Sequence, residues 1–199
     1  MRLVRATIAT PVGPMLTLAS DDALCALEFG IEQRHTRLDA RLARFYPDVL
    51  VEDGTNQVIT AVREWLDAYF AGAQADVQAL GLDARGTPFE RKVWRALLTI
   101  PVGETRSYGQ VAANAASTIL ASRAVGLANG ANPIAIIVPC HRVIGSDGSL
   151  TGYGGGLDRK MWLLEHEQRH WPTDTSVSQV SRPARSRSTR ESRQPRFEF

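Results

Sequence analysis

A strong helix start at Thr87 divides this chain of 199 residues into two regions of different character. Thr87 is a good N-cap, Pro88 suits the first helical position, and Glu90 completes a capping box. The segment before it, roughly 74–86, has the composition of a linker. We therefore expect two folded units, at 1–80 and 87–171, with residues 81–86 as the end of the linker.

The first region has the pattern of a small α/β unit. Three short apolar runs, at 3–9, 15–20 and 24–29, are separated by turn residues and predict a meander of antiparallel strands. A helix is expected at 32–45, and another begins after Asn56, where apolar residues recur at helical spacing.

The second region predicts short helices. The helix that begins at Pro88 is followed by a short one, which opens with a second capping box of Ser107 and Gln110. A third helix, at about 120–129, completes a helix-turn-helix form. This third helix is rich in small residues and carries Arg123, so it could lie close to a DNA backbone or pack tightly in the interior. The pattern does not decide between the two.

Reactive chemistry is concentrated in the pentapeptide Val138-Pro139-Cys140-His141-Arg142, at the end of an apolar run. A free thiol has a pKa near ~8.5 and is mostly protonated at neutral pH. A neighbouring histidine can lower that pKa and raise the nucleophilic fraction. The alternative is a buried structural cysteine, which is inert and common, because adjacency in sequence does not ensure contact in space.

Composition and charge argue against several classes of protein. Two distant cysteines make no disulfide framework, so a reducing cytoplasm is the expected compartment. The sequence has no CxxC or HExxH pattern, and we expect neither a metal nor a cofactor. No apolar run approaches the ~20 residues of a membrane span. A net charge of +2 does not by itself indicate nucleic acid. The segment 172–199 is rich in Arg and Ser and is predicted to be disordered.

Several motifs surround the pentapeptide. Pro-Cys-His-Arg at 139–142, with Asn132-Pro133 upstream and Tyr-x-Gly-Gly at 153–156 downstream, is a highly specific combination. Further matching stretches are Gly86–Phe89, Val93-Trp94, Gly103–Gly109, Arg123–Gly126 and Trp162–Glu167. In these residues the chain resembles the O6-alkylguanine-DNA alkyltransferases, also called methylated-DNA–protein-cysteine methyltransferases.

The resemblance implies a ribonuclease-H-like α/β domain with a small antiparallel sheet and helices, followed by a mostly α winged helix-turn-helix domain. Members bind double-stranded DNA, rotate an alkylated guanine out of the stack and move its alkyl group irreversibly onto their own cysteine. O6-alkylguanine is the implied substrate, with O4-alkylthymine as a second candidate. We expect a monomer in solution that has no membrane partner.

The resemblance also implies a role for each site residue. Cys140 would be the nucleophile and alkyl acceptor, His141 its base through a water, and Glu167 the residue that orients His141. Tyr108 would protonate the leaving O6, and Asn132 would brace the turn before the cysteine.

Other residues would contact DNA or the extruded base. Arg123 would occupy the gap that the base leaves in the duplex. The remaining implied DNA-binding residues are Tyr108, Ala121, Ser122 and Gly126, and the implied pocket residues are Pro139, Val143, Tyr153 and Gly154.

The chain departs from the family pattern in places. The stretch from Tyr108 to Arg123 is one residue longer than usual, and its turn at 116–120 lacks the usual Gly-x-Pro form, which puts DNA affinity in question. Gly154 stands where some members have serine, so tolerance of larger alkyl groups can differ. The Cys/His metal set of some animal members is absent, since Cys25 stands alone.

Two other functions compete with alkyl transfer. A non-catalytic binder of alkylated DNA is the main alternative, but such proteins lack the acceptor cysteine that Cys140 provides. A helix-turn-helix regulator that senses alkylation would need a further regulatory domain. Residues 1–86 contain no metal–thiolate cluster to supply one.

Overall fold

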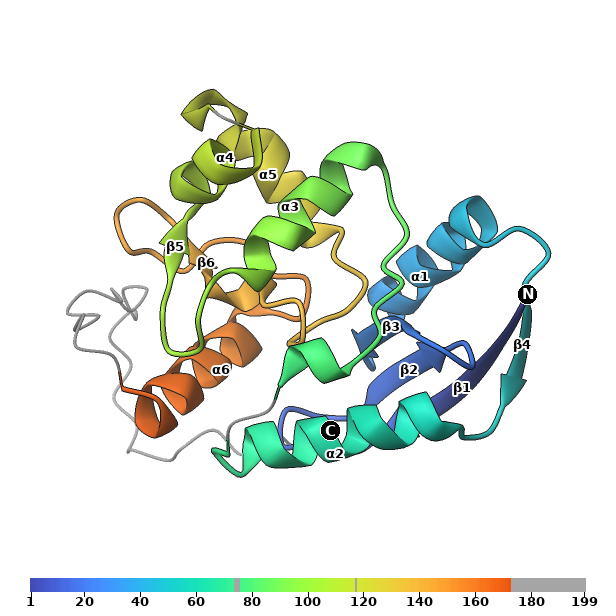
Figure 1. Cartoon of the computed structure of the whole chain (residues 1–199). Coiled ribbons are helices and arrows are strands. Elements are labelled where there is room, and N and C mark those ends of the chain that lie inside the picture. The colour runs from blue at the N-terminus through green and yellow to red at the C-terminus, as the bar shows by residue number, and fades with distance from the viewer. Residues whose placement is uncertain (74–75, 117, 173–199) are drawn as a thin grey trace.

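Two units lie side by side in the computed structural model, which describes residues 1–73, 76–116 and 118–172 (Figure 1). The first unit contains a sheet and two helices, and the second is mostly helical. This arrangement confirms the predicted order of an α/β unit followed by a helical unit. The tail that is predicted to be disordered lies, from residue 173 onward, outside the described residues.

The sheet of the first unit has the strand order β3-β2-β1-β4. Its strands are β1 (Arg2–Ile8), β2 (Met15–Ala19), β3 (Leu24–Phe29) and β4 (Leu50–Asp53). The first three pair antiparallel, as the meander pattern predicts, but β4 joins β1 in parallel and makes the sheet mixed rather than antiparallel. The sequence pattern misses β4 because all of its residues are exposed, so it lacks apolar alternation.

Two helices, α1 (Glu32–Phe45) and α2 (Gln57–Phe70), cover opposite faces of the sheet (Figure 1). α1 packs on the face that buries Leu3 and Leu18, whereas α2 packs on the face that buries Met15. The start of α2 is fixed as predicted, because the Asn56 side chain accepts a hydrogen bond from the backbone of Ile59 at 2.9 Å.

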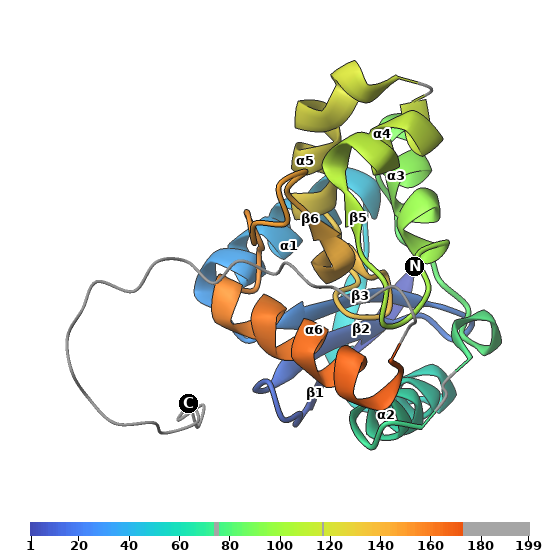
Figure 2. The same ribbon diagram turned by 90° about the vertical axis from the view of Figure 1, so that its left-hand side faces the viewer.

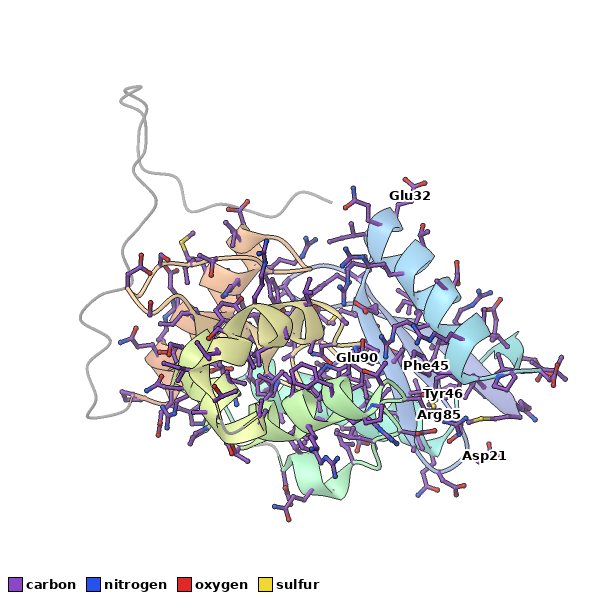
Figure 3. All side chains as sticks on the ribbon, turned by 90° about the horizontal axis from the view of Figure 1, so that it is seen from above. Asp21, Glu32, Phe45, Tyr46, Arg85 and Glu90 are labelled. Atoms are coloured by element: carbon purple, nitrogen blue, oxygen red, sulfur yellow. The ribbon has the colours of Figure 1, made fainter. Side chains whose placement is uncertain are left out.

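The end of α1 is tied to the linker and to the next helix. Arg41 donates to the backbone carbonyl of Arg85 at 2.5 Å and to the Glu90 carboxylate at 3.3 Å. Arg85 in turn donates to the carbonyl of Phe45 at 3.3 Å. Figure 3 shows Phe45, Arg85 and Glu90 close together where α1 ends. These contacts join the two units at one edge.

The helical elements that follow include both predicted capping boxes. Thr87 and Glu90 exchange hydrogen bonds of 2.7 and 3.2 Å, and Ser107 and Gln110 do the same at 2.7 and 3.2 Å. The elements are η1 (Val77–Ala79), α3 (Pro88–Leu98), α4 (Tyr108–Ala116), η2 (Ile119–Ala121), α5 (Ser122–Gly130), η3 (Cys140–Arg142) and α6 (Leu157–His170). The third predicted helix begins later than expected, at Ser122, because the residues before it form the 3-10 turn η2.

Two short strands connect the helix-turn-helix to the pentapeptide. β5 (Arg106–Ser107) pairs in parallel with β6 (Val143–Ile144), so the residues before α4 lie beside those that follow the cysteine. The chain turns tightly at Asp147-Gly148 just after β6, with Gly148 at a φ of 80° and its N–H donating to the carbonyl of Gly145 at 3.1 Å.

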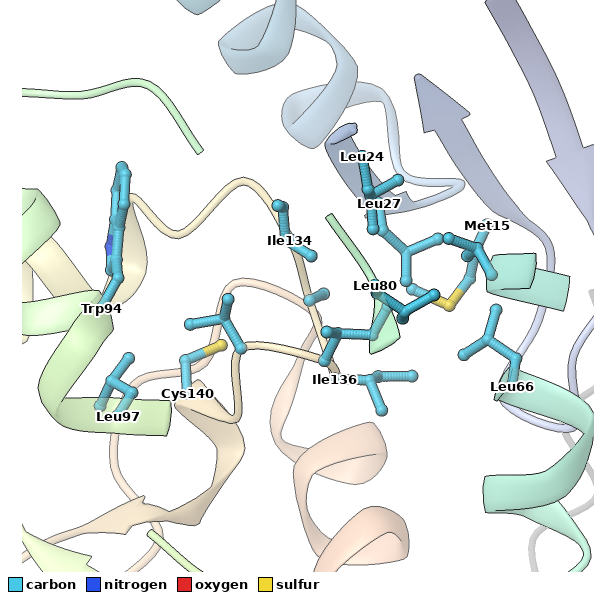
Figure 4. Close-up of a cluster of buried hydrophobic side chains, with 14 of the residues drawn as sticks. Met15, Leu24, Leu27, Leu66, Leu80, Trp94, Leu97, Ile134, Ile136 and Cys140 are labelled. Carbon is cyan, nitrogen blue, oxygen red and sulfur yellow. The ribbon is translucent and has the colours of Figure 1, made fainter. Parts of the chain in front are cut away.

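The apolar run before the cysteine attaches directly to the first unit. Leu27 in β3 donates to the carbonyl of Pro133 at 2.9 Å and accepts from Ala135 at 2.8 Å. One continuous apolar cluster therefore crosses the boundary between the units (Figure 4). Residues labelled along it are Met15, Leu27, Leu66, Ile134, Ile136, Cys140, Leu97 and Trp94.

The last helix, α6, lies next to the end of α2 (Figure 2). The His166 ring is hydrogen-bonded to the carbonyl of Tyr69 at 2.9 Å, and Trp171 stacks on the Tyr69 ring. Within the described ranges, no single helix is long and apolar enough to cross a membrane. Taken together, α4 and the continuous segment of η2 and α5 reach that length and composition, but these two segments are bent by 117° relative to each other.

Candidate active site

The Cys140 thiol is fixed at the junction of the two units. Cys140 begins η3, directly after the apolar run that is bonded to β3, and is only 6% exposed. Its backbone N–H donates to Val138 at 2.8 Å, and the Asn132 side chain donates to its sulfur at 3.1 Å. The sulfur is thus buried but has a polar partner.

Asn132 holds the turn that leads to this thiol. Its Nδ2 also donates to the carbonyls of Val138 at 2.9 Å and Ile134 at 3.2 Å, and its Oδ1 accepts from the Ile134 N–H at 3.0 Å. With both ends of the amide engaged and the residue 1% exposed, the side chain has little freedom. This geometry fits the bracing role that the resemblance implies.

The Glu167 carboxylate, on α6, bonds polar groups of four residues from three other segments. It lies 2.7 Å from His141 Nε2, accepts two bonds of 2.9 Å from Arg142, and accepts from the Tyr69 hydroxyl at 2.8 Å and the Gly103 N–H at 3.1 Å. His141 is fully buried, and its second ring nitrogen, Nδ1, has no hydrogen-bond partner among the described residues. Glu167 thus fixes the ring and leaves Nδ1 for another group.

The pKa shifts of this set have clear causes. Burial raises the pKa of the Cys140 thiol, although the Asn132 hydrogen bond opposes the shift. Burial likewise lowers the pKa of His141, against the pull of Glu167. Burial alone would raise the pKa of Glu167, but His141 and Arg142 hold it well below its ordinary value. At neutral pH the site therefore holds a neutral thiol, a neutral imidazole and a carboxylate.

Two tyrosine hydroxyls near the thiol are weakly bonded or unbonded among the described residues. The Tyr108 hydroxyl, at the start of α4, lies 3.4 Å from each of the carbonyls of Thr151 and Gly152. Burial raises the pKa of Tyr108, so it keeps its proton at neutral pH. The Tyr153 hydroxyl is buried without a partner in the part of the chain that the structure describes. These hydroxyls remain available to a ligand.

Two hollows lie next to these tyrosines. A small cavity of about 10 Å³ adjoins Cys140, and a groove of about 820 Å³ lies between α1 and the helical unit. Tyr153 and Gly154 line both, whereas Tyr108 and Gly126 line the groove. Of the predicted pocket residues, Pro139 and Val143 line neither.

The helix α5 has one buried face and one open face. Its buried residues are Val125, Ala128 and Asn129. Arg123 is exposed, and Leu127, 75% exposed, lines the groove. Ala121 and Ser122, just before these residues, are half-buried. The helix therefore has one face packed in the interior and one face open toward the groove.

Three residues of the site have no predicted role. Arg142 belongs to the pentapeptide, so its position could have suggested a partner for Glu167. Tyr69 comes from α2 and Lys160 from α6, and local sequence gives no signal for either. Lys160 is buried and donates to the carbonyl of Val143 at 2.6 Å, and burial lowers its pKa to about 8. No group of three or more Cys, His, Asp or Glu that could hold a metal occurs among residues 1–73, 76–116 and 118–172.

Comparison with known proteins gives matches for both units. Residues 88–169 match the family described as 6-O-methylguanine DNA methyltransferase, DNA binding domain. Residues 3–84 match the 6-O-methylguanine DNA methyltransferase, ribonuclease-like domain.

Relatives match over most of the chain. A methylated-DNA–protein-cysteine methyltransferase of Mycobacterium bovis is 49% identical over 173 residues, which is 86% of this chain and 96% of that protein. One from Salmonella typhimurium is 45% identical over 84% of this chain and 96% of that protein. Among solved structures, Mycobacterium tuberculosis OGT in complex with DNA has a TM-score of 0.69 and 43% identity, covering 89% of this chain and 99% of that chain.

Fold and site together define a class of protein with a ribonuclease-like domain and a helical DNA-binding domain, which carries a buried thiol beside a histidine–carboxylate pair. The chain belongs to the 6-O-methylguanine DNA methyltransferase family.

Proposed function

We propose that this chain repairs DNA directly, by moving the alkyl group of O6-alkylguanine irreversibly onto its own Cys140. The observation that carries this proposal is the His141 ring, next in sequence to the buried thiol. Glu167 holds the ring through Nε2, and Nδ1 has no hydrogen-bond partner in the described part of the chain. This is the order of nucleophile, base and orienting residue found in activated nucleophiles. Its relatives, which are named methylated-DNA–protein-cysteine methyltransferases, support it.

The transfer balances as a displacement at the alkyl carbon. His141 takes the thiol proton through a water, and the electron pair on the Cys140 sulfur forms the new S–C bond. The C–O6 bond breaks, and its electrons stay on O6 of guanine. The product thioether has no thiolate left to react, so each molecule acts once. The raised pKa of Cys140 makes this base necessary, because few thiolates exist at rest.

The leaving oxygen needs a proton as negative charge develops on the guanine. Tyr108 is the proposed donor, because its hydroxyl is protonated, borders the groove and contacts the carbonyls of Thr151 and Gly152 at the long distance of 3.4 Å. Asn132 positions the thiol for the attack through its bond to the sulfur.

Double-stranded DNA is the proposed partner, bound along α5. The exposed side chain of Arg123 would fill the gap left by the extruded base, and Ala121, Ser122 and Gly126 are small enough for close approach to the strand. Gly154 and Tyr153, which line the cavity beside Cys140, would contact the base. A cytoplasmic monomer is the proposed form.

The decisive test is mass spectrometry of the full chain after incubation with a duplex that contains one O6-methylguanine. We expect the mass of one methyl group on the peptide that contains Cys140. Cys140→Ala should lose transfer and still bind the duplex, whereas Cys25→Ala, at the other buried free cysteine, should retain transfer. An unchanged mass with intact DNA binding would support the non-catalytic binder of alkylated DNA instead.

A further inference from the structure

The cavity beside Cys140 is far too small for a purine. Its volume of about 10 Å³ suits roughly one water molecule. The groove outside it, at about 820 Å³, is in the size range of ligand sites. Four residues line both spaces and so form the wall between them: Arg34, Gly130, Tyr153 and Gly154. A base held in the groove must therefore pass its O6-alkyl group through this wall to reach the thiol.

Arg34 supplies the charged part of the wall, and it comes from the ribonuclease-like domain. Its guanidinium makes two bonds to the Glu28 carboxylate, at 2.6 and 2.8 Å, and both residues are buried, at 7% and 2% exposed. The same guanidinium donates to the carbonyls of Gly130 at 2.9 Å and Asn132 at 2.8 Å. Glu28 thus holds Arg34 in one position, and Arg34 reaches the backbone of the residue that bonds the thiol.

Because Gly154 has no side chain, the Arg34 guanidinium can pack directly against its backbone. A Cβ built on Gly154 would lie 2.5 Å from Arg34 Nη1, which is closer than real contacts allow. The Arg34 side chain therefore occupies the space that a side chain at position 154 would fill. Arg34 is also close enough to influence the thiol, since it opposes the rise in the pKa of Cys140.

We propose that Arg34, held by Glu28, is a specificity-determining residue that limits the size of the O6-alkyl group able to reach Cys140. This inference rests on the proposed alkyl transfer. A methyl group needs little more room than the water-sized cavity provides, whereas a bulky group must push the guanidinium away from Glu28, Gly130 and Asn132. Displacing a buried arginine that makes four hydrogen bonds is costly, so the wall discriminates against large groups.

The test compares transfer rates for two duplexes, one with O6-methylguanine and one with O6-benzylguanine, using the full chain. Glu28→Ala combined with Arg34→Ala removes both charges and leaves no unpaired carboxylate. We expect the benzyl-to-methyl rate ratio to rise about tenfold in this double variant, mainly through faster benzyl transfer. Glu28→Gln, which keeps Arg34 but loosens its anchor, should raise the ratio by about threefold.

Arg37→Ala is the matched control, because Arg37 is an exposed arginine on the same helix that lines the groove but not the cavity. It should change both rates by the same factor. A ratio within about twofold of the unmodified protein, in a folded variant that still transfers methyl, overturns the proposal. If the double variant fails to fold, the ratio in Glu28→Gln decides in the same way. Absence of methyl transfer by the unmodified chain would overturn the proposed function, and this inference with it.

Discussion

The two sides of the Cys140 thiol differ in how completely their polar groups are bonded. On the inner side, Glu167 binds His141, Arg142 and Tyr69 at 2.7 to 2.9 Å. On the groove side, the Tyr108 hydroxyl makes long contacts of 3.4 Å with the carbonyls of Thr151 and Gly152. The inner set is already bonded without DNA, whereas the Tyr108 and Tyr153 hydroxyls on the groove side have long contacts or, among the described residues, no hydrogen-bond partner.

This difference separates stability from recognition. Removing a buried charge that is fully paired strongly destabilises the fold, because its partners are left buried without a counter-charge. A half-exposed hydroxyl with long contacts contributes little to folding but is free to act on a substrate. Substitutions on the two sides should therefore affect different measurements.

The largest expected effect is on the inner side. Glu167→Ala leaves His141 and Arg142 buried without their carboxylate, so we expect a loss of about 3–5 kcal/mol in the free energy of unfolding. Urea denaturation at pH 7 measures it. Glu165→Ala, an exposed glutamate on the same helix, is the matched control and should stay within about 0.5 kcal/mol of the unmodified protein.

Acid titration gives a second readout of the same carboxylate. The folded-state pKa of Glu167 lies below its pKa in the unfolded chain, which is about 4.3. The contribution of this carboxylate to the free energy of unfolding is therefore complete above that pH and is lost as the pH falls further. Glu167→Gln should flatten this part of the stability curve. An equally steep acid loss in the variant would assign the effect to other groups.

A pair of tyrosine substitutions compares the two sides directly. Tyr108→Phe should slow methyl transfer by about a hundredfold, because the leaving O6 loses its proton donor, and should leave unfolding within about 0.5 kcal/mol. Tyr69→Phe, which removes a 2.8 Å bond to Glu167, should instead destabilise the fold by about 1–2 kcal/mol. Equal transfer rates for Tyr108→Phe and the unmodified chain at saturating DNA would remove Tyr108 from the mechanism.

The smallest effect is expected at the outer surface. Arg123→Ala should slow repair of duplex DNA by about tenfold more than transfer from free O6-methylguanine base, because only the duplex needs its gap filled. Arg95→Ala tests a second exposed arginine, on α3, that does not line the groove, and should change neither rate. Equal losses on both substrates for Arg123→Ala would contradict a role in base extrusion.

Much of this protein could be predicted from residues close together in the chain. The capping boxes at Thr87 and Ser107 form as predicted, because each joins groups only three residues apart. The antiparallel meander follows from apolar runs between turns. The pentapeptide around Cys140 identified the family through its neighbours in sequence. β4 was missed, since an exposed edge strand carries no apolar pattern.

The sequence by itself determined most of the elements, the family and the candidate nucleophile, because hydrogen bonds within a turn and apolar periodicity are local properties. Only the tertiary structure decided what surrounds the nucleophile. Tyr69 and Glu167 meet across 98 positions, as do Arg34 and Asn132, and no local pattern records either pairing. Such contacts arise because the apolar run before Cys140 bonds to β3, which brings the ribonuclease-like domain against the thiol. The enclosure of the acceptor cysteine is thus a property of two packed domains rather than of the motif.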